Sequence, residues 1–271
     1  MNTQIKLAII AIIIVIPLAS LAITQPNLSS EISTTENSKL KIVTSANFLY
    51  EFSQNIGKEM VDVTLLVPMG ADPHDWEPTI RDTERLQEAD MIIVNGIGYE
   101  HWLNSLEVTD IPGILVDTSN GISTLDSAKY DEEKHDDHAK EDGHDDEDKH
   151  DEHNHGALDP HIWLNPVFAQ LQVKNIANAL SNSDPTNKNY YQSNAAIYNQ
   201  ELNLLDTKIR TELSGCKTDF ITFHDAFSYF SEEYGLTQHT IISSIDSHGE
   251  VTPKTLENII SLARELNIKV I

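Results

Sequence analysis

The sequence is poor in cysteine and in basic residues. Its one cysteine, Cys216, can form neither an internal disulfide nor a multi-cysteine zinc site. We expect this lone thiol to be a small buried residue rather than a nucleophile. Lysine and arginine together number 18 against 43 aspartates and glutamates, which gives a formal net charge of −25. So acidic a chain would repel phosphate, which argues against nucleic acid as a partner and favours cations.

Two common hydrolase motifs are also absent. The chain has no His-Glu-x-x-His metalloprotease motif and no Gly-x-Ser-x-Gly nucleophile elbow. Glu77 could be proposed as a general base, but its place just before Pro78 and Thr79 favours a role as a helix cap. We therefore predict that the chain is not an enzyme.

One long apolar run is present, and it lies near the N-terminus. Lys6 precedes apolar residues 7–23, and Ser20-Leu21-Ala22 has the small-x-small form of a cleavage site. We interpret residues 1–23 as a signal peptide or as an uncleaved membrane anchor, because the run is just long enough to span a bilayer. The polar residues 24–38 would be a linker. We therefore expect export to the periplasm or to the extracellular face of the membrane.

From residue 39 onward, short β-branched runs alternate with segments of helical periodicity. The strands and helices predicted over the first part of the chain are strands at 40–44, 61–67, 91–94 and 114–116, and helices at 48–56, 79–89, 99–106 and 167–180. This alternation is typical of an α/β fold with a parallel sheet covered by helices on both faces.

Residues 131–155 interrupt this pattern. They contain 13 acidic residues, 3 lysines and 6 histidines, with no aliphatic side chain larger than alanine. Such a segment cannot bury enough apolar surface to offset its ordering entropy, so we expect a solvated, disordered loop. It either gathers metal for the rest of the chain or is a tether that binds Zn2+ weakly and incidentally. Its histidines, the candidate auxiliary ligands, are His135, His138, His144, His150, His153 and His155.

Residues 187–213 form a long helical pattern without glycine or proline. A helix of 27 residues would be about 40 Å long, which is more than one small lobe needs. We interpret 187–214 as a rigid linking helix between an N-terminal α/β lobe, 39–186, and a C-terminal α/β lobe, 215–271. The second lobe is predicted to hold a strand at 220–223 and a helix at 255–266. It is short, and the chain ends inside an apparent strand at 268–271, so we expect the sequence to lack its C-terminal portion.

Three histidines outside the acidic loop share a context. His74 and His161 each end an Asp-Pro-His tripeptide, in which proline presents the imidazole on a stiff turn. His74 follows the strand at 61–67 and His224 follows the strand at 220–223, where α/β sheets bind ligands. Three imidazoles predict a Zn2+ site, because Zn2+ accepts histidine nitrogen and prefers four tetrahedral ligands. Catalytic zinc has the same layout, so an exported zinc-dependent enzyme remains an alternative.

Other polar residues lie near these histidines. The aspartates that flank them are Asp72, Asp75, Asp159 and Asp225. They either orient the imidazoles by accepting the second N–H or cap helices. The histidines interpreted as structural are His101, His239 and His248.

Four segments resemble the metal-binding solute-binding proteins of zinc and manganese ABC transporters. They are GADPHDWEPT (70–79), NGIGYEHWL (95–103), DPHIWLNP (159–166) and TFHDAFSYF (222–230). The resemblance extends from about residue 39 to 271. It implies two α/β lobes joined by a rigid helix, with the metal in the cleft between them, and a monomer that delivers the ion to an ABC transporter permease. The acidic, histidine-rich insert also resembles that of the zinc-specific branch.

By this resemblance His74, His161 and His224 match the family's metal ligands. Manganese members typically have glutamate at the third position and zinc members histidine, in keeping with the preferences of the two ions. We therefore expect high-affinity capture of Zn2+, with Mn2+ or iron as the alternative cargo. The family's fourth ligand position would fall beyond Ile271. Exported members of this family are described as adhesins in some bacteria, so adhesion is a further alternative.

Overall fold

The computed structural model describes residues 39–106, 111–125, 158–242 and 251–268. The predicted signal peptide or anchor, the polar linker and the acidic histidine-rich loop lie outside these residues, and so does His248. Among the helices of the described part of the chain, none is both long enough and apolar enough to cross a membrane.

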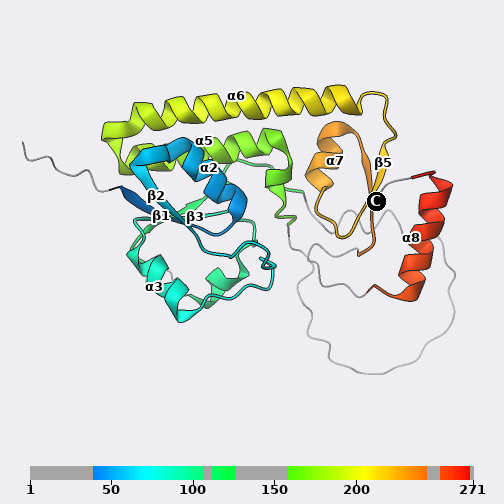
Figure 1. Cartoon of the computed structure of the whole chain (residues 1–271), viewed down its shortest axis with the longest axis horizontal. Helices are drawn as coiled ribbons and strands as arrows, with labels where there is room; N and C mark the ends of the chain where they lie inside the picture. The colour runs from blue at the N-terminus through cyan, green and yellow to red at the C-terminus, as the bar shows by residue number, and fades with distance from the viewer. Residues whose placement is uncertain (1–38, 107–110, 126–157, 243–250, 269–271) are drawn as a thin grey trace, which may run out of the picture. The chain divides into compact units, whose positions relative to one another are not determined.

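Strands and helices alternate along the described chain (Figure 1). In order, with 3-10 helices labelled η, they are β1 (Leu40–Thr44), α2 (Asn47–Gly57), η1 (Lys58–Met60), β2 (Val61–Leu65), α3 (Ile80–Glu88), β3 (Met91–Val94), η2 (His101–Ser105), β4 (Ile114–Asp117), η4 (Ile162–Leu164), α5 (Pro166–Ser183), η5 (Pro185–Asn187), α6 (Lys188–Leu213), β5 (Asp219–Thr222), α7 (Ser228–Tyr234), β6 (Thr237–Thr240) and α8 (Pro253–Glu265).

Strands β1 to β4 form one parallel sheet in the order β2-β1-β3-β4. Met91 at the start of β3 pairs with Ile42 on one side and with Ile114 on the other. All four residues of β3 are buried, as expected for an inner strand covered on both faces. The predicted parallel sheet is therefore confirmed. Because the strands are parallel, the loops that follow them leave from one edge of the sheet, and β2 leads there to His74.

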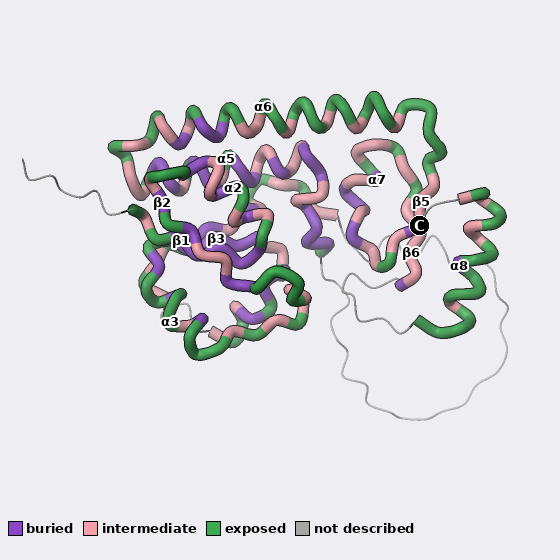
Figure 2. Tube along the Cα trace, in the orientation of Figure 1, coloured by how far each residue is buried: buried purple, intermediate pink, exposed green. Residues whose placement is uncertain are grey.

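Alternate residues of the inner strands contact opposite helical layers, since successive strand side chains point to opposite faces. Ile42 and Ile93 pack in a cluster with α2, α5 and the first half of α6. Ile92 packs in a second cluster with Leu86 of α3 and Trp102 of η2. Figure 2 shows the buried residues concentrated in this sheet and in the helix faces turned toward it. The two clusters together pack against both faces of the sheet whose carboxyl edge carries the loop of His74.

Helix α6 extends from the first sheet toward the second. Near its start Tyr191 and Ala195 are buried in the first cluster. Further along, Leu202 still packs against this cluster, whereas Leu205 is 45% exposed. Near its end Arg210 forms an ion pair with Glu233 of α7. The helix thus contacts elements around both sheets (Figure 1).

The second sheet contains β5 and β6, which are parallel and are connected through α7. Gly235 ends α7 in the left-handed conformation, with φ 66°, which glycine adopts without strain. His239 on β6 lies 2.9 Å from an oxygen of Asp219 on β5, which agrees with a structural role. Neither α7 nor β6 was predicted from the sequence. Both are short, and β6 reads Thr-Gln-His-Thr, which gives no apolar signal.

Two local predictions are wrong. Cys216 is exposed just after α6, so it is not the small buried residue that was expected. Glu77 does not cap α3: the cap is Thr79, whose side chain and that of Asp82 form a reciprocal capping box. The predicted strand at 268–271 is not tested beyond Ile268, because residues 269–271 lie outside the described chain.

Candidate metal centre

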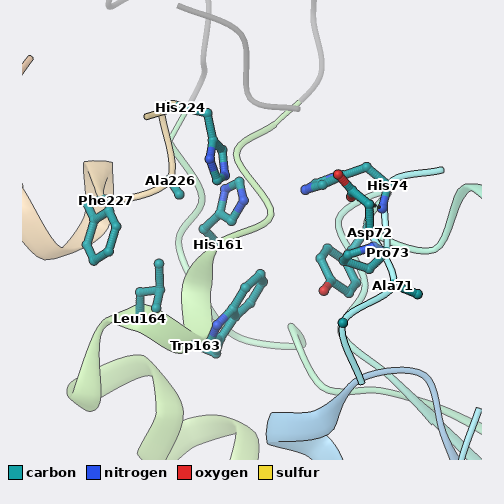
Figure 3. Close-up of a pocket in the computed structure, with 12 residues that line it drawn as sticks. Ala71, Asp72, Pro73, His74, His161, Trp163, Leu164, His224, Ala226 and Phe227 are labelled. Atoms are coloured by element: carbon teal, nitrogen blue, oxygen red, sulfur yellow. Dashed lines mark hydrogen bonds between the residues drawn. The ribbon is translucent and has the colours of Figure 1, made fainter. Parts of the chain in front are cut away.

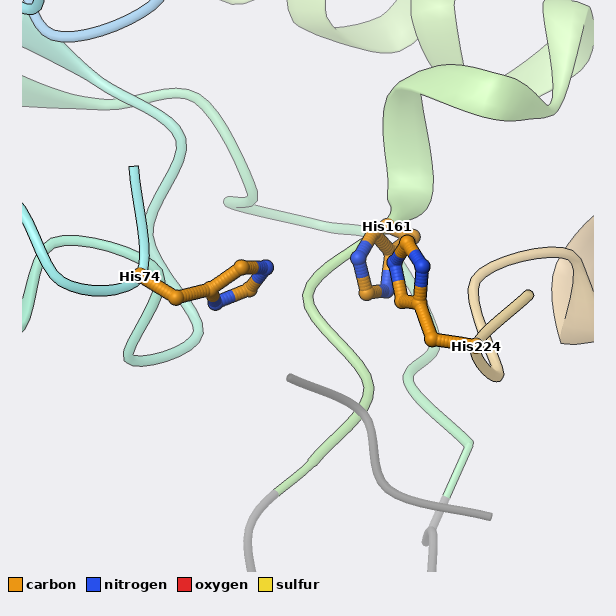
Figure 4. Close-up of side chains that lie close together, drawn as sticks. All are labelled: His74, His161 and His224. Atoms are coloured by element: carbon orange, nitrogen blue, oxygen red, sulfur yellow. The ribbon is translucent and has the colours of Figure 1, made fainter. Parts of the chain in front are cut away.

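The three predicted histidines come together in space. Each offers one ring nitrogen, and these nitrogens all lie within 4.8 Å of one another. The ring centroids are 5.6 Å apart for His74 and His161 and 5.4 Å apart for His161 and His224. His74 approaches from one side, and the other two imidazoles lie side by side opposite it (Figure 4). Residues separated by up to 150 positions in the chain therefore form one cluster.

The loop after β2 presents His74. Gly70 has φ 85°, a left-handed conformation that lets the chain turn after the strand. The backbone N–H of Ala71 then donates to the carbonyl of Pro68 at 3.1 Å. The backbone N–H of His74 donates to an Asp72 carboxylate oxygen at 3.0 Å. These bonds define a tight local turn, so the direction of the imidazole is set by the loop itself.

Asp159 holds His161 on the opposite side. One oxygen of this carboxylate accepts the backbone N–H of His161 at 2.9 Å and lies 2.8 Å from its Nδ1. Asp159 and His161 are 2% and 3% exposed, so water does not compete for these contacts. A carboxylate oxygen is a hydrogen-bond acceptor, so this contact suits the tautomer with the proton on Nδ1, which leaves the lone pair of Nε2 for a metal.

His224 lies in the loop after β5, and three hydrogen bonds to its backbone carbonyl hold it there. The donors are the hydroxyl of Thr222 at 3.0 Å, the amide of Gln238 at 3.2 Å and the backbone N–H of Ala226 at 3.0 Å. Burial lowers the pKa of the His224 imidazole, and the nearby His161 lowers it further. Because Zn2+ binds neutral imidazole, His224 stays ready to bind at lower pH than an exposed histidine would.

A cavity of about 460 Å³ opens beside the histidines. Figure 3 shows His74 on one side of it, His161 and His224 on the other, and Trp163 along the wall. Trp163 stacks on Phe48 with ring centroids 4.3 Å apart, and Tyr99 packs edge-on against Trp163 at 5.1 Å. Burial raises the pKa of the Tyr99 hydroxyl, so it remains a neutral phenol and adds no anionic ligand.

The geometry suits a small ion with nitrogen ligands. With Zn–N distances of about 2.0–2.1 Å, two nitrogens of a tetrahedral site are about 3.3 Å apart. Nitrogens within 4.8 Å of one another then need to approach by at most about 1.5 Å. Side-chain rotation or a small loop shift supplies such a movement, so a large closure of the protein is not required.

Among the described residues, the remaining predicted site residues lie outside the three-histidine cluster. The six histidines of the acidic loop lie outside the described residues. Asp159 contacts an imidazole, as one of the two predicted roles requires, whereas Asp225 accepts the hydroxyl of Ser228 at the start of α7 at 3.1 Å. His101 is exposed.

Two residues beside the site were not predicted from the sequence. The side-chain amide of Asn95 donates to the Pro160 carbonyl at 2.8 Å, one residue before His161. Tyr99 lines the cavity, with its ring centroid 5.6 Å from that of His74. Both residues belong to the segment 95–103, so the resemblance marked the segment. The local pattern gave no sign that its side chains reach the histidines.

Comparisons with known proteins agree on one family. The family described as "Zinc-uptake complex component A periplasmic" has a sequence model that matches residues 42–271. The high-affinity zinc uptake system protein ZnuA of Bacillus subtilis is 41% identical over 236 residues, covering 86% of this chain and 70% of the relative. The metal ABC transporter substrate-binding lipoprotein FimA of Streptococcus parasanguinis is 30% identical, covering 85% and 70%. The crystal structure of the metal-dependent lipoprotein YcdH of B. subtilis is similar, with a TM-score of 0.67, 35% identity and coverage of 85% and 77%.

Proposed function

Because the chain belongs to the family of periplasmic A components of zinc-uptake complexes, we propose that it captures Zn2+ outside the cytoplasm and delivers it to an ABC transporter permease. Proteins of this family are substrate-binding components of ABC transporters and not enzymes. The ion is therefore cargo, which the chain binds and releases unchanged. The affinity has to be high enough to take Zn2+ from dilute surroundings and still allow release at the permease.

We propose His74, His161 and His224 as the ligands of this ion. One observation carries the proposal: three imidazole nitrogens from three separate loops lie within 4.8 Å of one another beside a cavity. Imidazoles gain little from such close approach to one another, since protonation of one disfavours protonation of the next. A shared cation gives a physical reason for the cluster. The lowered pKa of His224 keeps its imidazole neutral and available to that cation.

The same site supports Zn2+ over Mn2+. Its three proposed protein ligands are nitrogen donors, which suit Zn2+, whereas Mn2+ prefers carboxylate and water oxygen. All three ligands come from one chain, so we also propose that a monomer is the binding unit. A formal charge of −25 makes nucleic acid an unsuitable partner. Export by residues 1–23 would place the protein where its relatives are described, as periplasmic proteins and lipoproteins.

A competitive titration tests the cargo. The chain is titrated with Zn2+, Mn2+ and Fe2+ in turn against a chelator of known affinity. We expect one tight Zn2+ site that excess Mn2+ does not displace. Tighter binding of Mn2+ would keep the family and change the cargo, and the absence of any tight site would overturn the proposal.

Single substitutions test the ligands. We expect His74→Ala, His161→Ala and His224→Ala each to raise the Kd for Zn2+ by more than about 100-fold, since loss of a ligand should exceed the 10–100-fold cost of losing a residue that orients one. His101→Ala is the matched control, because this exposed histidine lies outside the cluster and should leave the Kd unchanged. Wild-type affinity after substitution of any two of the three would reject the ligand assignment.

A further inference from the structure

The two carbonyl groups just before His161 are held from opposite sides of the site. The Pro160 carbonyl accepts a hydrogen bond from Asn95, which follows β3 of the first sheet. The Asp159 carbonyl accepts one from the hydroxyl of Tyr229 at 2.6 Å. Tyr229 belongs to α7, which begins four residues after His224. The turn that presents His161 is therefore attached to both parts of the protein that supply the other histidines.

Tyr229 makes further contacts with the same region. Its hydroxyl also accepts the backbone N–H of Leu125 at 3.2 Å. Its backbone carbonyl accepts from the side chain of Asn165 at 3.3 Å, and Asn165 lies four residues after His161. The ring packs edge-on against Phe168 of α5 with centroids 5.4 Å apart, and the residue is 2% exposed. Side chain and backbone of one residue thus hold α7 against the segment that carries His161.

We propose that Tyr229 is a positioning residue for zinc capture: its hydroxyl fixes the Asp159-Pro160-His161 turn against α7 and so sets the spacing between His161 and His224. This inference rests on the proposed function of the three histidines. A tetrahedral ion tolerates little error in that spacing, because its nitrogen ligands lie at about 2.0–2.1 Å. A free protein that already holds the two imidazoles close together spends less binding energy on bringing them to the ion.

The affinity for Zn2+ depends on the fraction of the free protein that holds the imidazoles in the arrangement that binds the ion. When only a fraction of the free protein has the imidazoles in place, the apparent Kd rises by the reciprocal of that fraction. Removing the hydroxyl of Tyr229 leaves the ring and its packing on Phe168, but it releases the Asp159 carbonyl. We expect this loss to lower the competent fraction about tenfold, an effect of the size that one or two buried hydrogen bonds produce.

The test is Tyr229→Phe compared with two control variants. Tyr191→Phe is matched in burial, because Tyr191 is fully buried and donates to Asp184 at 2.8 Å, away from the histidines. Tyr234→Phe is matched in position, because Tyr234 lies on the same helix and donates to Asp206 at 2.9 Å. Each control removes a tyrosine hydrogen bond and leaves the Asp159 carbonyl bonded.

Zn2+ affinity and the visible spectrum of bound Co2+ are measured for all four proteins. We expect Tyr229→Phe to raise the Kd about tenfold and to weaken the intense absorption of tetrahedral Co2+, while both controls keep wild-type values. The rise in melting temperature on adding Zn2+ is compared within each variant, so that a general loss of stability does not affect the result. It should be smaller in Tyr229→Phe than in either control.

The outcomes separate the two proposals. If the wild-type chain has no tight Zn2+ site, the proposed function fails. If the wild type binds tightly and Tyr229→Phe matches the controls in Kd, spectrum and zinc-dependent melting shift, the function stands and the positioning role is rejected.

Discussion

At the scale of single residues, Asp159 is the group most closely tied to the proposed ligands. One of its oxygens contacts His161 through both the backbone N–H and Nδ1. The other oxygen is buried and makes no hydrogen bond within the described chain. Burying part of a carboxylate without a partner destabilises the metal-free protein. A divalent cation bound to the neighbouring imidazole would offset that cost by attraction to the carboxylate.

We therefore predict that Asp159→Asn weakens zinc binding. Asparagine keeps the shape of aspartate but removes the charge that holds the Nδ1 proton and strengthens Nε2 as a donor. We expect the Kd for Zn2+ to rise by about 10- to 100-fold, the usual effect of losing the residue that orients a metal-binding histidine. Isothermal titration against a competing chelator gives the value.

Asp219→Asn is the control, since Asp219 makes the same kind of contact, at 2.9 Å, with His239 between β5 and β6. An equal rise in Kd for both variants would show that the effect is general, and would remove Asp159 from its special role.

The sequence alone was enough to predict the candidate site residues, but it could not assign a role to each of them. The two Asp-Pro-His tripeptides and the strand before His224 were enough to select the three histidines that cluster. For the flanking aspartates two roles stayed open from the sequence. The structure shows Asp159 in contact with an imidazole, and Asp225 accepting the hydroxyl of Ser228 at the start of α7. Asp159 lies two residues before His161, and Asp225 directly follows His224. Their orientation depends on contacts that the local pattern does not contain.

At the scale of elements, one buried carboxylate joins the ends of two strands. Glu100 accepts hydrogen bonds from the hydroxyl of Ser45, which follows β1, at 2.5 Å, and from the backbone N–H of Asn95, which follows β3, at 2.7 Å. A third comes from the backbone N–H of Gly96 at 3.1 Å. Burial raises the pKa of Glu100 to about 7, because desolvation outweighs these bonds, which lower it. Glu100 thus braces the loop from which Asn95 reaches Pro160.

This shifted pKa predicts a pH dependence of stability. A carboxyl group whose folded pKa is raised stabilises the fold while it is protonated, and that contribution is lost as the pH rises through the folded value. Between its ordinary pKa of 4.5 and about 7, the folded chain keeps a proton that the unfolded chain has released. The free energy of unfolding should then fall by about 1.4 kcal/mol per pH unit from this group. Urea unfolding at several pH values measures the slope.

Glu100→Gln should make the slope less negative by that amount, because glutamine carries no titrating proton. Glu77→Gln serves as the control, since Glu77 is exposed and its replacement leaves the buried carboxylate in place. Parallel profiles for the wild type and Glu100→Gln would contradict the raised pKa.

Elements differ in how well their sequence predicts them. The bounds predicted for the strands at 40–44 and 91–94 match β1 and β3 to the residue, because both are short segments rich in β-branched residues in a sheet covered on both faces. Helix α7 has seven residues and β6 has four, mostly polar, so neither carries enough apolar period to be recognised. They form through contacts with the rest of the second sheet, which local propensity does not report.

At the scale of the whole molecule, the candidate site depends on distances that no local pattern encodes. His74, His161 and His224 come from loops on different elements, and their spacing follows from how the sheet, α5 and α7 pack. The resemblance in four segments predicted that these loops converge. It could not supply the individual contacts, such as Asn95 to Pro160 or Tyr229 to Asp159, through which they do so.

The described residues on the two sides of 126–157 lie close to each other. On its two sides the described chain is joined by a hydrogen bond from the backbone N–H of Asp159 to the carbonyl of Leu125, at 3.4 Å. The hydroxyl of Tyr229 also bonds to both of these residues. The two attachment points of residues 126–157 are therefore adjacent, and a few residues are enough to connect them.

We predict that deletion of 131–155 leaves the fold and the tight Zn2+ site intact and removes weaker Zn2+ binding. The attachment points stay joined by the Leu125–Asp159 bond, and the three proposed ligands lie outside the deletion. The six histidines and 13 acidic residues of 131–155 attract cations, and the deletion removes all of them. Equilibrium dialysis at rising Zn2+ should show one ion per deleted chain and more than one per full chain.

A variant that keeps the length of 131–155 but replaces its six histidines by asparagine separates the contribution of the imidazoles from that of the acidic charge. Loss of the tight site in either variant would move the ligands into the segment and contradict the assignment to His74, His161 and His224.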